Sequence, residues 1–205
     1  MNTADIIGIS RHRLGTDGEG VTTLVGFYGC PLRCRYCLNP ACFSPETKRI
    51  TLTPEQLYEK VKIDDLYFQA TNGGVVFGGG EPLTHVPFLR EFKLLCPPEW
   101  KLHAETSLNV PEEAISGAAK IFDHFFIDCK DTDTEIYRSY TGKDNERMLS
   151  NLKTLLALVP AERITVRLPL IPDYNTEGNR DRSEKLLREM GVVIFDRFVY
   201  RLPKT

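Results

Sequence analysis

The stretch Val-Thr-Thr-Leu-Val-Gly-Phe-Tyr-Gly-Cys-Pro-Leu-Arg-Cys-Arg-Tyr-Cys, residues 21–37, joins a strand-like segment directly to a cysteine-rich loop. Its first part, Val21–Gly29, is rich in β-branched and aromatic residues, which favour a β-strand. The loop that follows holds Cys30, Cys34 and Cys37, with three and then two residues between them. Three thiols this close on one loop suit an iron–sulfur cubane held at three corners. Such clusters usually have four cysteine ligands. With only three cysteines on this loop, the fourth iron would stay open to a small molecule.

A structural zinc site is the main alternative for these cysteines. Such sites take four Cys or His ligands, usually as two separated pairs. The pair Cys34 and Cys37 has no second pair downstream, because the later cysteines are isolated. A zinc site would therefore need Cys30 and Cys42 as its remaining ligands. A disulfide framework is disfavoured, because six cysteines in 205 residues are far below the density of small secreted scaffolds.

Length and composition indicate one globular domain, residues 1–205, with no linker or second domain. The hydrophobic fraction of 41% and the charged fraction of 26% are typical of globular proteins. A net charge of −2 gives no reason to expect nucleic acid as a partner. Residues 1–7 lack the basic start and apolar stretch of a signal peptide. No apolar run reaches the roughly 18 residues of a membrane helix, and we expect a cytoplasmic protein that does not bind membranes.

Strand-like and helix-like segments alternate along the chain. The expected strands are Val21–Gly29, Gly74–Phe77, Lys101–Thr106, Phe122–Lys130, Arg163–Leu168 and Val192–Tyr200. The expected helices are Pro54–Lys62, capped by Thr53, then Val86–Leu95, Pro111–Lys120, Asp133–Tyr140, Asn145–Leu158 and Thr176–Met190. This alternation predicts parallel βα units with right-handed connections.

The expected βα units favour an α/β fold, specifically a partial (β/α)6 TIM-type barrel. A complete eight-unit barrel takes about 250 residues, so a chain of 205 residues accommodates about six units. A doubly wound sheet is the alternative. The barrel is favoured because polar residues end the expected strands, at the rim where barrel loops converge on ligands. These residues are Glu81, Glu105, Asp128, Lys130 and Arg167.

A glycine-rich turn, Gly78-Gly79-Gly80-Glu81-Pro82, directly follows the expected strand Gly74–Phe77. Glycines let a backbone approach a ligand closely and expose its N–H and C=O groups. The Glu81 carboxylate suits a cationic amine. A plain strand-to-helix turn would explain the glycines alone. Their position one βα unit after the cysteine loop favours a ligand site.

The cysteine loop and the glycine turn together resemble the signature of radical S-adenosylmethionine (SAM) enzymes. That signature is a CxxxCx-aromatic-C loop followed by a GGE turn. A further likeness is to the activating enzymes of glycyl radical enzymes, typified by the pyruvate formate-lyase activating enzyme. It extends from about residue 7 to residue 200 and rests on Asp17–Val21, on Gly29–Pro40, on Asp128–Lys130, on Thr141-Gly142 with Asn145 and Asn151, and on Arg167 followed by Ile171-Pro172.

The resemblance implies an oxidoreductase with a [4Fe–4S] cluster and SAM as cofactors, and with Cys30, Cys34 and Cys37 as the cluster ligands. In this family an electron from the reduced cluster cleaves SAM into methionine and a 5′-deoxyadenosyl radical, which abstracts a hydrogen atom from the substrate. In the activating branch the substrate is a glycine Cα–H on a partner enzyme, and a flavodoxin or ferredoxin supplies the electron. We therefore expect no catalytic residue beyond the cluster and SAM.

The same resemblance places residues of both motifs around SAM. Tyr36 is expected beside the adenine, where a mere packing role is its alternative. Gly79, Gly80 and Glu81 are expected to receive the methionine amino group.

The residues that end the later strands complete the expected SAM site. Lys130 is suited to the SAM carboxylate and shares a strand face with Asp128, while Arg167 is expected to face the same ligand. Some activating enzymes also bind a monovalent cation, for which Glu105, Thr106 and Asp128 would supply oxygens. Internal ion pairs or solvated rim charges are the alternative roles.

Three departures from the family pattern bear on these roles. Glu105 stands where the activating branch usually has Asp, which puts the geometry of a cation site in doubt. Gly18-Glu19 replaces the usual Gly-Pro of the segment before the first strand. The family carries a His near the SAM ribose after its sixth strand, and here either Tyr200 or Arg201 takes its place or the contact is absent.

Other functions stay open at this point. One is a radical SAM enzyme for a different peptide or small molecule. Another is a non-catalytic module that binds zinc or a cluster. Arg33 and Arg35 flank the cysteines, where they could balance the cluster charge, meet an acidic electron donor or simply be solvated.

Overall fold

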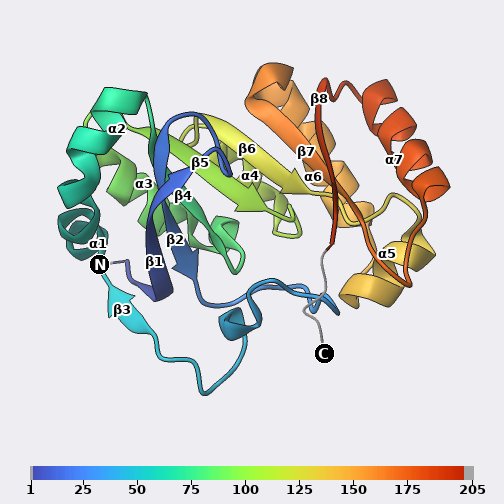
Figure 1. Ribbon diagram of the computed structural model, residues 1–205, viewed down its shortest axis with the longest axis horizontal. Helices are drawn as coiled ribbons and strands as arrows, with labels where there is room; N and C mark the ends of the chain where they lie inside the picture. The colour runs from blue at the N-terminus through green and yellow to red at the C-terminus, as the bar shows by residue number, and fades with distance from the viewer. Residues whose placement is uncertain (1, 201–205) are drawn as a thin grey trace.

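Within residues 2–200, which the computed structural model describes, one curved sheet of eight strands organises the protein (Figure 1). Its strands lie in the order β3-β1-β2-β4-β5-β6-β7-β8. Their bounds are β1 Ala4–Leu14, β2 Val21–Phe27, β3 Ile50–Leu52, β4 Gly74–Gly79, β5 Lys101–Thr106, β6 His124–Asp128, β7 Ile164–Leu170 and β8 Ile194–Val199. β1 pairs antiparallel with β2 and β3, whereas β2 and β4 to β8 run parallel.

Helices follow the parallel strands and cover the outer face of the sheet (Figure 1). They are α1 Pro54–Val61, α2 Asp65–Thr71, α3 Val86–Leu95, α4 Glu112–Ala118, α5 Thr134–Thr141, α6 Glu146–Leu158 and α7 Glu177–Glu189. Thr53 caps α1 as expected, because its side chain accepts a hydrogen bond from the Gln56 backbone N–H. None of the helices in the described part of the chain is long and apolar enough to span a membrane.

The partial barrel expected from the sequence is confirmed. From β2 onward the parallel strands lie side by side in chain order, without the reversal that defines a doubly wound sheet. Within residues 2–200 the terminal strands β3 and β8 do not pair with each other, so the barrel stays open. All the expected strands and helices form, and their boundaries differ from expectation by at most two residues.

Three elements were not anticipated, namely β1, β3 and α2. β1 carries charged and half-exposed residues over most of its length, so it lacks a continuous apolar signal. β3 is only three residues long. α2 leaves Leu66 and Tyr67 exposed, so its apolar residues do not mark a buried helical face. β1 and β3 add to one edge of the sheet rather than to its parallel core, and α2 packs against β2.

The two faces of the parallel strands have different chemistry. On β6, Phe125 and Ile127 are fully buried toward the helices, while the alternate residues His124 and Asp128 face the barrel interior and line cavities there. The outer face packs aromatic rings against the helices, as where Phe77 meets Phe92 of α3 with ring centroids 5.3 Å apart. The apolar core therefore lies outside the barrel, which leaves its interior free for polar groups.

Asn151 of α6 holds the segment that follows β5. Its side-chain amide donates hydrogen bonds to the carbonyl oxygens of Leu108 and Val110, each at 2.8 Å, and it is buried. These carbonyls belong to a loop that also carries Ser107, which reaches the barrel interior. Asn151 thus links the outer helix layer to the rim of the interior.

We expect Asn151→Ala to lower the free energy of unfolding by about 2–4 kcal/mol, because it leaves two buried carbonyl groups without donors. Ser150→Ala is the matched control, since Ser150 is the exposed neighbour on the same helix. It should change stability by less than about 0.5 kcal/mol. Urea unfolding of both variants checks this, and equal midpoints would contradict the role of Asn151.

Candidate functional site

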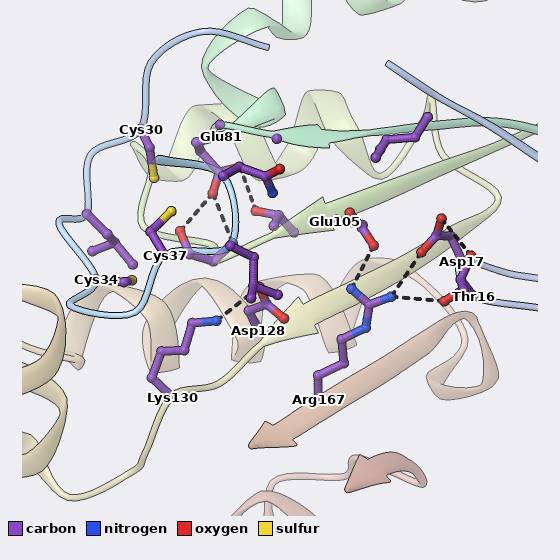
Figure 2. Close-up of a pocket in the computed structure, with 18 of the residues that line it drawn as sticks. Thr16, Asp17, Cys30, Cys34, Cys37, Glu81, Glu105, Asp128, Lys130 and Arg167 are labelled. Carbon is purple, nitrogen blue, oxygen red and sulfur yellow. Dashed lines mark hydrogen bonds and ion pairs between the residues drawn. The ribbon is translucent and has the colours of Figure 1, made fainter. Parts of the chain in front are cut away.

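A cavity of about 550 Å³ opens on the inner face of the barrel at the C-terminal ends of the strands (Figure 2). The structure brings to it every site residue expected from the sequence except Tyr36. These residues are Cys30, Cys34, Cys37, Gly79, Gly80, Glu81, Glu105, Asp128, Lys130 and Arg167. Thr106, Asp17, Ser107 and Tyr200 line the same cavity.

The cysteine loop forms one wall of this cavity. Cys30, Cys34 and Cys37 are free thiols, partly exposed, and all three line the cavity (Figure 2). The loop rests on the end of α5, because the backbone N–H groups of Arg33 and Arg35 donate to carbonyls there at 2.9 and 3.0 Å. One loop therefore presents three sulfur donors to the same space.

The protonation of these thiols is set by their surroundings. Burial raises the pKa of Cys30 to about 12 and also raises that of Cys34. A hydrogen bond from Cys42 lowers the pKa of Cys37 to about 6. Thiols must lose their protons to bind a metal, so loading of this wall would release protons.

The donor set fits a cubane better than a single ion. Within residues 2–200, no group of three or more Cys, His, Asp or Glu side chains converges closely enough to hold one metal ion. Cys42, the fourth ligand that a zinc site would need, is buried and does not line the cavity. In a [4Fe–4S] cluster each thiolate binds a different iron. Three separated thiols around one cavity suit that arrangement.

The glycine turn packs directly against the start of the cysteine loop. The Gly80 N–H donates to the Phe27 carbonyl at 2.9 Å, and the Glu81 N–H donates to the Gly29 carbonyl at 2.8 Å. A Cβ atom on Gly80 would lie only 2.1 Å from the Gly29 carbonyl oxygen. Gly79 has a φ of 79°, which favours glycine. The two motifs therefore form one rigid unit that tolerates no side chain at the contact.

The Glu81 carboxylate is 1% exposed and already bound by its own chain. It accepts hydrogen bonds from the Leu83 N–H, the Thr106 hydroxyl, and the N–H and hydroxyl of Ser107, at 2.7–3.1 Å. Burial raises its pKa despite these donors. A carboxylate has about four acceptor positions, so a ligand amine would have to replace one of these donors. The expected contact with an amino group stays a prediction.

Lys130 projects into the cavity with Asp128, on the strand face expected from their spacing (Figure 2). Its ammonium lies 3.1 Å from the Asp128 carboxylate and donates to the Tyr200 hydroxyl at 3.2 Å. Burial lowers the pKa of Lys130, but Asp128 and the neighbouring Tyr200, Cys34 and Tyr140 together outweigh burial, and the pKa is raised. Lys130, only 6% exposed, therefore carries a fixed positive charge in the cavity wall. Tyr200 thus reaches the site, whereas Arg201 lies outside the described residues.

Arg167 closes the floor of the cavity with a network of charges. Its guanidinium donates to Glu105 at 2.7 Å and lies 3.6 Å from Asp17 (Figure 2). It also lies over the Phe126 ring, 4.7 Å from the ring centroid. Asp17 is buried and also binds Arg13. Glu105 and Arg167 thus form the internal ion pair that the sequence left as an alternative role.

Among the lining residues that had no role assigned from the sequence, two are buried polar residues, Asp17 and Ser107. Asp17 was noted only as the start of the segment before the first strand, and its position there was the signal that could have found it. Ser107 follows the strand end at Thr106, but nothing in the sequence distinguishes it from an ordinary loop serine. Both act through contacts with distant residues that a linear pattern does not show.

Tyr36 belongs to the cysteine loop but lies outside the cavity lining. Its ring meets those of Tyr140 and Tyr174 with centroids 6.1 and 5.7 Å away, and its hydroxyl donates to Asp173 at 3.2 Å. In this structure Tyr36 has the packing role that was its alternative. A contact with adenine stays a prediction.

One carboxyl group of this charge network, that of Glu105, has a pKa near neutral pH. Burial raises the pKa of Glu105 from 4.5 to about 7, with a further contribution from Asp17, and Arg167 only partly offsets both. A raised carboxyl pKa means that the folded protein holds this proton more tightly than the unfolded chain does. The resulting stabilisation is complete below about pH 4.5 and is lost as the pH rises through about 7.

We therefore expect the metal-free protein to lose stability relative to Glu105→Gln as the pH rises from 5 to 8. The expected loss is on the order of 1–3 kcal/mol. Urea unfolding at several pH values measures it, and Glu99→Gln, which changes an exposed carboxylate, is the control. A difference between parent and Glu105→Gln that does not vary with pH would contradict the raised pKa.

Comparison with protein families and curated proteins gives a consistent result. Residues 24–181 match the model of the Radical SAM superfamily. The (2S)-3-sulfopropanediol dehydratase activating enzyme of Klebsiella oxytoca is 26% identical over 238 residues, covering 85% of this chain and 74% of the relative. The pyruvate formate-lyase 2-activating enzyme of Escherichia coli (strain K12) is 28% identical over 204 residues, covering 84% of this chain and 68% of the relative.

Solved structures share the fold over most of this chain. SuiB of Streptococcus suis bound to S-adenosylmethionine has a TM-score of 0.63 at 13% identity, covering 88% of this chain and 42% of that one. The protein anSMEcpe with bound AdoMet has a TM-score of 0.57 at 17% identity, covering 83% of this chain and 47% of that one. This chain therefore spans less than half the length of either structure.

The matched region contains the whole cysteine loop, the glycine turn, Lys130 and Arg167. The resemblance seen in the sequence is thus confirmed, and the cofactors of this class of enzyme are a [4Fe–4S] cluster and SAM. On its motifs, its fold and the family match together, the chain belongs to the radical SAM superfamily, with activating enzymes among its relatives.

Proposed function

We propose that this protein is a radical SAM activating enzyme that installs a glycyl radical on a partner enzyme. The observation that carries the proposal is the cavity wall formed by three free thiols of one loop, with no fourth thiol among the described lining residues. The activating enzymes among its relatives support the reaction class.

The three cysteines would hold the cluster and leave one iron to SAM. When bound, the cluster and SAM supply a one-electron cleavage of the sulfonium that yields methionine and a 5′-deoxyadenosyl radical. The protein then has to orient the cofactors and exclude side reactions. We assign these tasks to groups already fixed in the cavity wall.

Each wall of the cavity has a separate task in this proposal. The Lys130 ammonium, held by Asp128, offers a positive charge to a ligand carboxylate. The backbone of Gly79 and Gly80 offers polar groups that no side chain covers. Arg167, paired with Glu105, holds a charged side chain in place at the floor of the cavity.

The reaction also sets requirements outside the cavity. Each cleavage consumes one electron, which we assign to a flavodoxin or ferredoxin. A cluster and free thiols persist in a reducing compartment, so we place the protein in the cytoplasm. The oxygens for a monovalent cation would come from Glu105, Thr106 and Asp128. Glu105 is engaged by Arg167 and Asp128 by Lys130, so a cation would have to compete with both.

Anaerobic reconstitution with iron and sulfide, followed by dithionite and SAM, should yield 5′-deoxyadenosine. Cys34→Ala should reduce the yield at least about tenfold because the cluster loses a ligand. Cys96→Ala should retain it, since Cys96 ends α3 and does not line the cavity. Chromatographic quantitation checks both. Fully loaded parent protein that forms no 5′-deoxyadenosine with any reductant would contradict the proposal.

Activation of a glycyl radical enzyme is tested separately. Pyruvate formate-lyase incubated with the loaded protein and SAM serves as the first probe, because a relative is named for it. A glycyl radical signal in electron paramagnetic resonance would support the activase reading. Formation of 5′-deoxyadenosine without a radical on this or other glycyl radical enzymes would favour a different peptide or small-molecule substrate.

Lys130→Met tests the assigned carboxylate contact. The substitution keeps the length of the side chain and removes its charge, so SAM should bind about tenfold more weakly or worse, a difference of about 1.4 kcal/mol. Equilibrium dialysis measures the affinity, and the iron content should not change. Lys153→Met on the exposed side of α6 is the control. Loss of iron in Lys130→Met, or unchanged affinity, would show that the residue has another role.

A further inference from the structure

Two buried tyrosine hydroxyls on α5 have no hydrogen-bond partner within residues 2–200. Tyr137 and Tyr140 are both 0% exposed, and neither hydroxyl meets a donor or acceptor in hydrogen-bond geometry. A buried polar group without a partner destabilises a protein, and native structures contain few of them. Of the three such side-chain atoms found in the described part of the chain, two lie on this one helix. Their position therefore calls for an explanation.

The cysteine loop rests on the same helix. The backbone N–H groups on either side of Cys34, those of Arg33 and Arg35, donate to carbonyls at the end of α5 at 2.9 and 3.0 Å. One of these carbonyls is that of Tyr140 itself. The Cys34 side chain also packs against the buried aromatic group to which Tyr140 belongs. Tyr140 thus lies beside an expected ligand of the cluster.

Aromatic neighbours hold the ring of Tyr140 in place. The ring centroids of Tyr174, Tyr36 and Tyr200 lie 5.0, 6.1 and 6.3 Å from its own. Tyr140 does not line the cavity, whereas Cys34 does. Tyr140 therefore stands behind Cys34, within the protein rather than in the space for the ligands.

The Tyr140 hydroxyl keeps its proton at neutral pH and can act as a donor. Burial raises the pKa of Tyr140, and Tyr200 and the Cys34 thiol raise it further, although Lys130 opposes them. The Tyr200 hydroxyl is close by but outside hydrogen-bond geometry, and it already accepts a hydrogen bond from Lys130. The Tyr140 proton thus has no acceptor among the described residues.

A bound cluster would supply such an acceptor. A neutral thiol is a weak acceptor, whereas a thiol that coordinates a metal has lost its proton. Hydrogen bonds to an ionised acceptor are roughly twice as strong as those between neutral groups. Hydrogen bonds to the sulfur atoms of an iron–sulfur cluster are one of the factors that set its reduction potential.

We propose that the Tyr140 hydroxyl donates a hydrogen bond to the Cys34 thiolate of the bound cluster and thereby raises the reduction potential of that cluster. The inference rests on the proposed function, because that function requires a cluster that accepts one electron. Reduction adds negative charge to the cluster, so a donor at one sulfur stabilises the reduced form more than the oxidised form. The hydroxyl keeps its proton, and no covalent bond forms or breaks.

The test compares two conservative variants within one aromatic group. Tyr140→Phe removes the hydroxyl and keeps the ring. Tyr174→Phe is the matched control, because it makes the same change in a half-buried tyrosine that packs on Tyr140. The reconstituted proteins are compared in iron content and in midpoint potential, by a redox titration followed with electron paramagnetic resonance. Neither measurement needs SAM or turnover.

Tyr140→Phe should lower the midpoint potential by an amount equal to about a tenfold change in the reduction equilibrium, which is about 59 mV for a one-electron couple. Tyr174→Phe should change the same equilibrium less than about twofold, and both variants should keep the iron content of the parent. In the metal-free protein, Tyr140→Phe should unfold at the same or a higher urea concentration, because the lost hydroxyl had no partner.

Different outcomes point to different errors. If the parent takes up no cubane, the proposed function and this inference both fail. If the cubane forms but SAM is not cleaved, the proposed function is wrong, and the potential still decides the role of Tyr140. Equal potentials in the parent and in Tyr140→Phe overturn the inference, and a loss of stability without a shift in potential shows a purely structural role. A shift in Tyr137→Phe but not in Tyr140→Phe overturns the assignment and places the donor at the other hydroxyl of α5.

Discussion

The contact between the glycine turn and the start of the cysteine loop supports the rest of the site. Two backbone hydrogen bonds, from Gly80 to Phe27 and from Glu81 to Gly29, join β4 to the end of β2. The buried Glu81 side chain extends the join to β5 by accepting hydrogen bonds from Thr106 and Ser107. A Cβ atom at Gly80 would collide with the Gly29 carbonyl. Strand ends and thiols are thereby held at fixed positions around one cavity.

The open barrel allows this site to hold buried charged groups. The apolar core lies between sheet and helices, so the interior can hold charged groups provided that they are paired. Lys130 pairs with Asp128, and Arg167 pairs with Glu105. These pairs keep polar side chains ordered in the wall and floor before any ligand arrives. Preorganisation of this kind lets binding groups act without a large cost of rearrangement.

The parallel core of the fold could be predicted because each βα unit leaves a local signal. Glycines end the strand at β4, Thr53 and Pro54 begin α1, and apolar runs mark the strands. β1 gave no such signal, because only Ala4 and Ile6 of its residues are buried and the rest are half-exposed or exposed where it pairs with β2 and β3. The cavity residues were predicted where they belong to a motif or a strand end. Asp17 and Ser107 were missed because their importance lies in contacts with Arg167 and Glu81, far away in the chain. Tyr36 stands at a motif position, yet neighbouring tyrosines determine where its ring packs.

The proposed chemistry requires that three thiols of this chain hold a cluster with one iron left for SAM. Mössbauer spectroscopy of protein reconstituted with ⁵⁷Fe tests it most directly, because it resolves individual iron sites. A site with three thiolate ligands should give a cubane in which one iron differs from the other three and changes its signal when SAM is added. A cluster with four cysteine-ligated irons that ignores SAM, or the absence of any cubane in fully reconstituted protein, would contradict it.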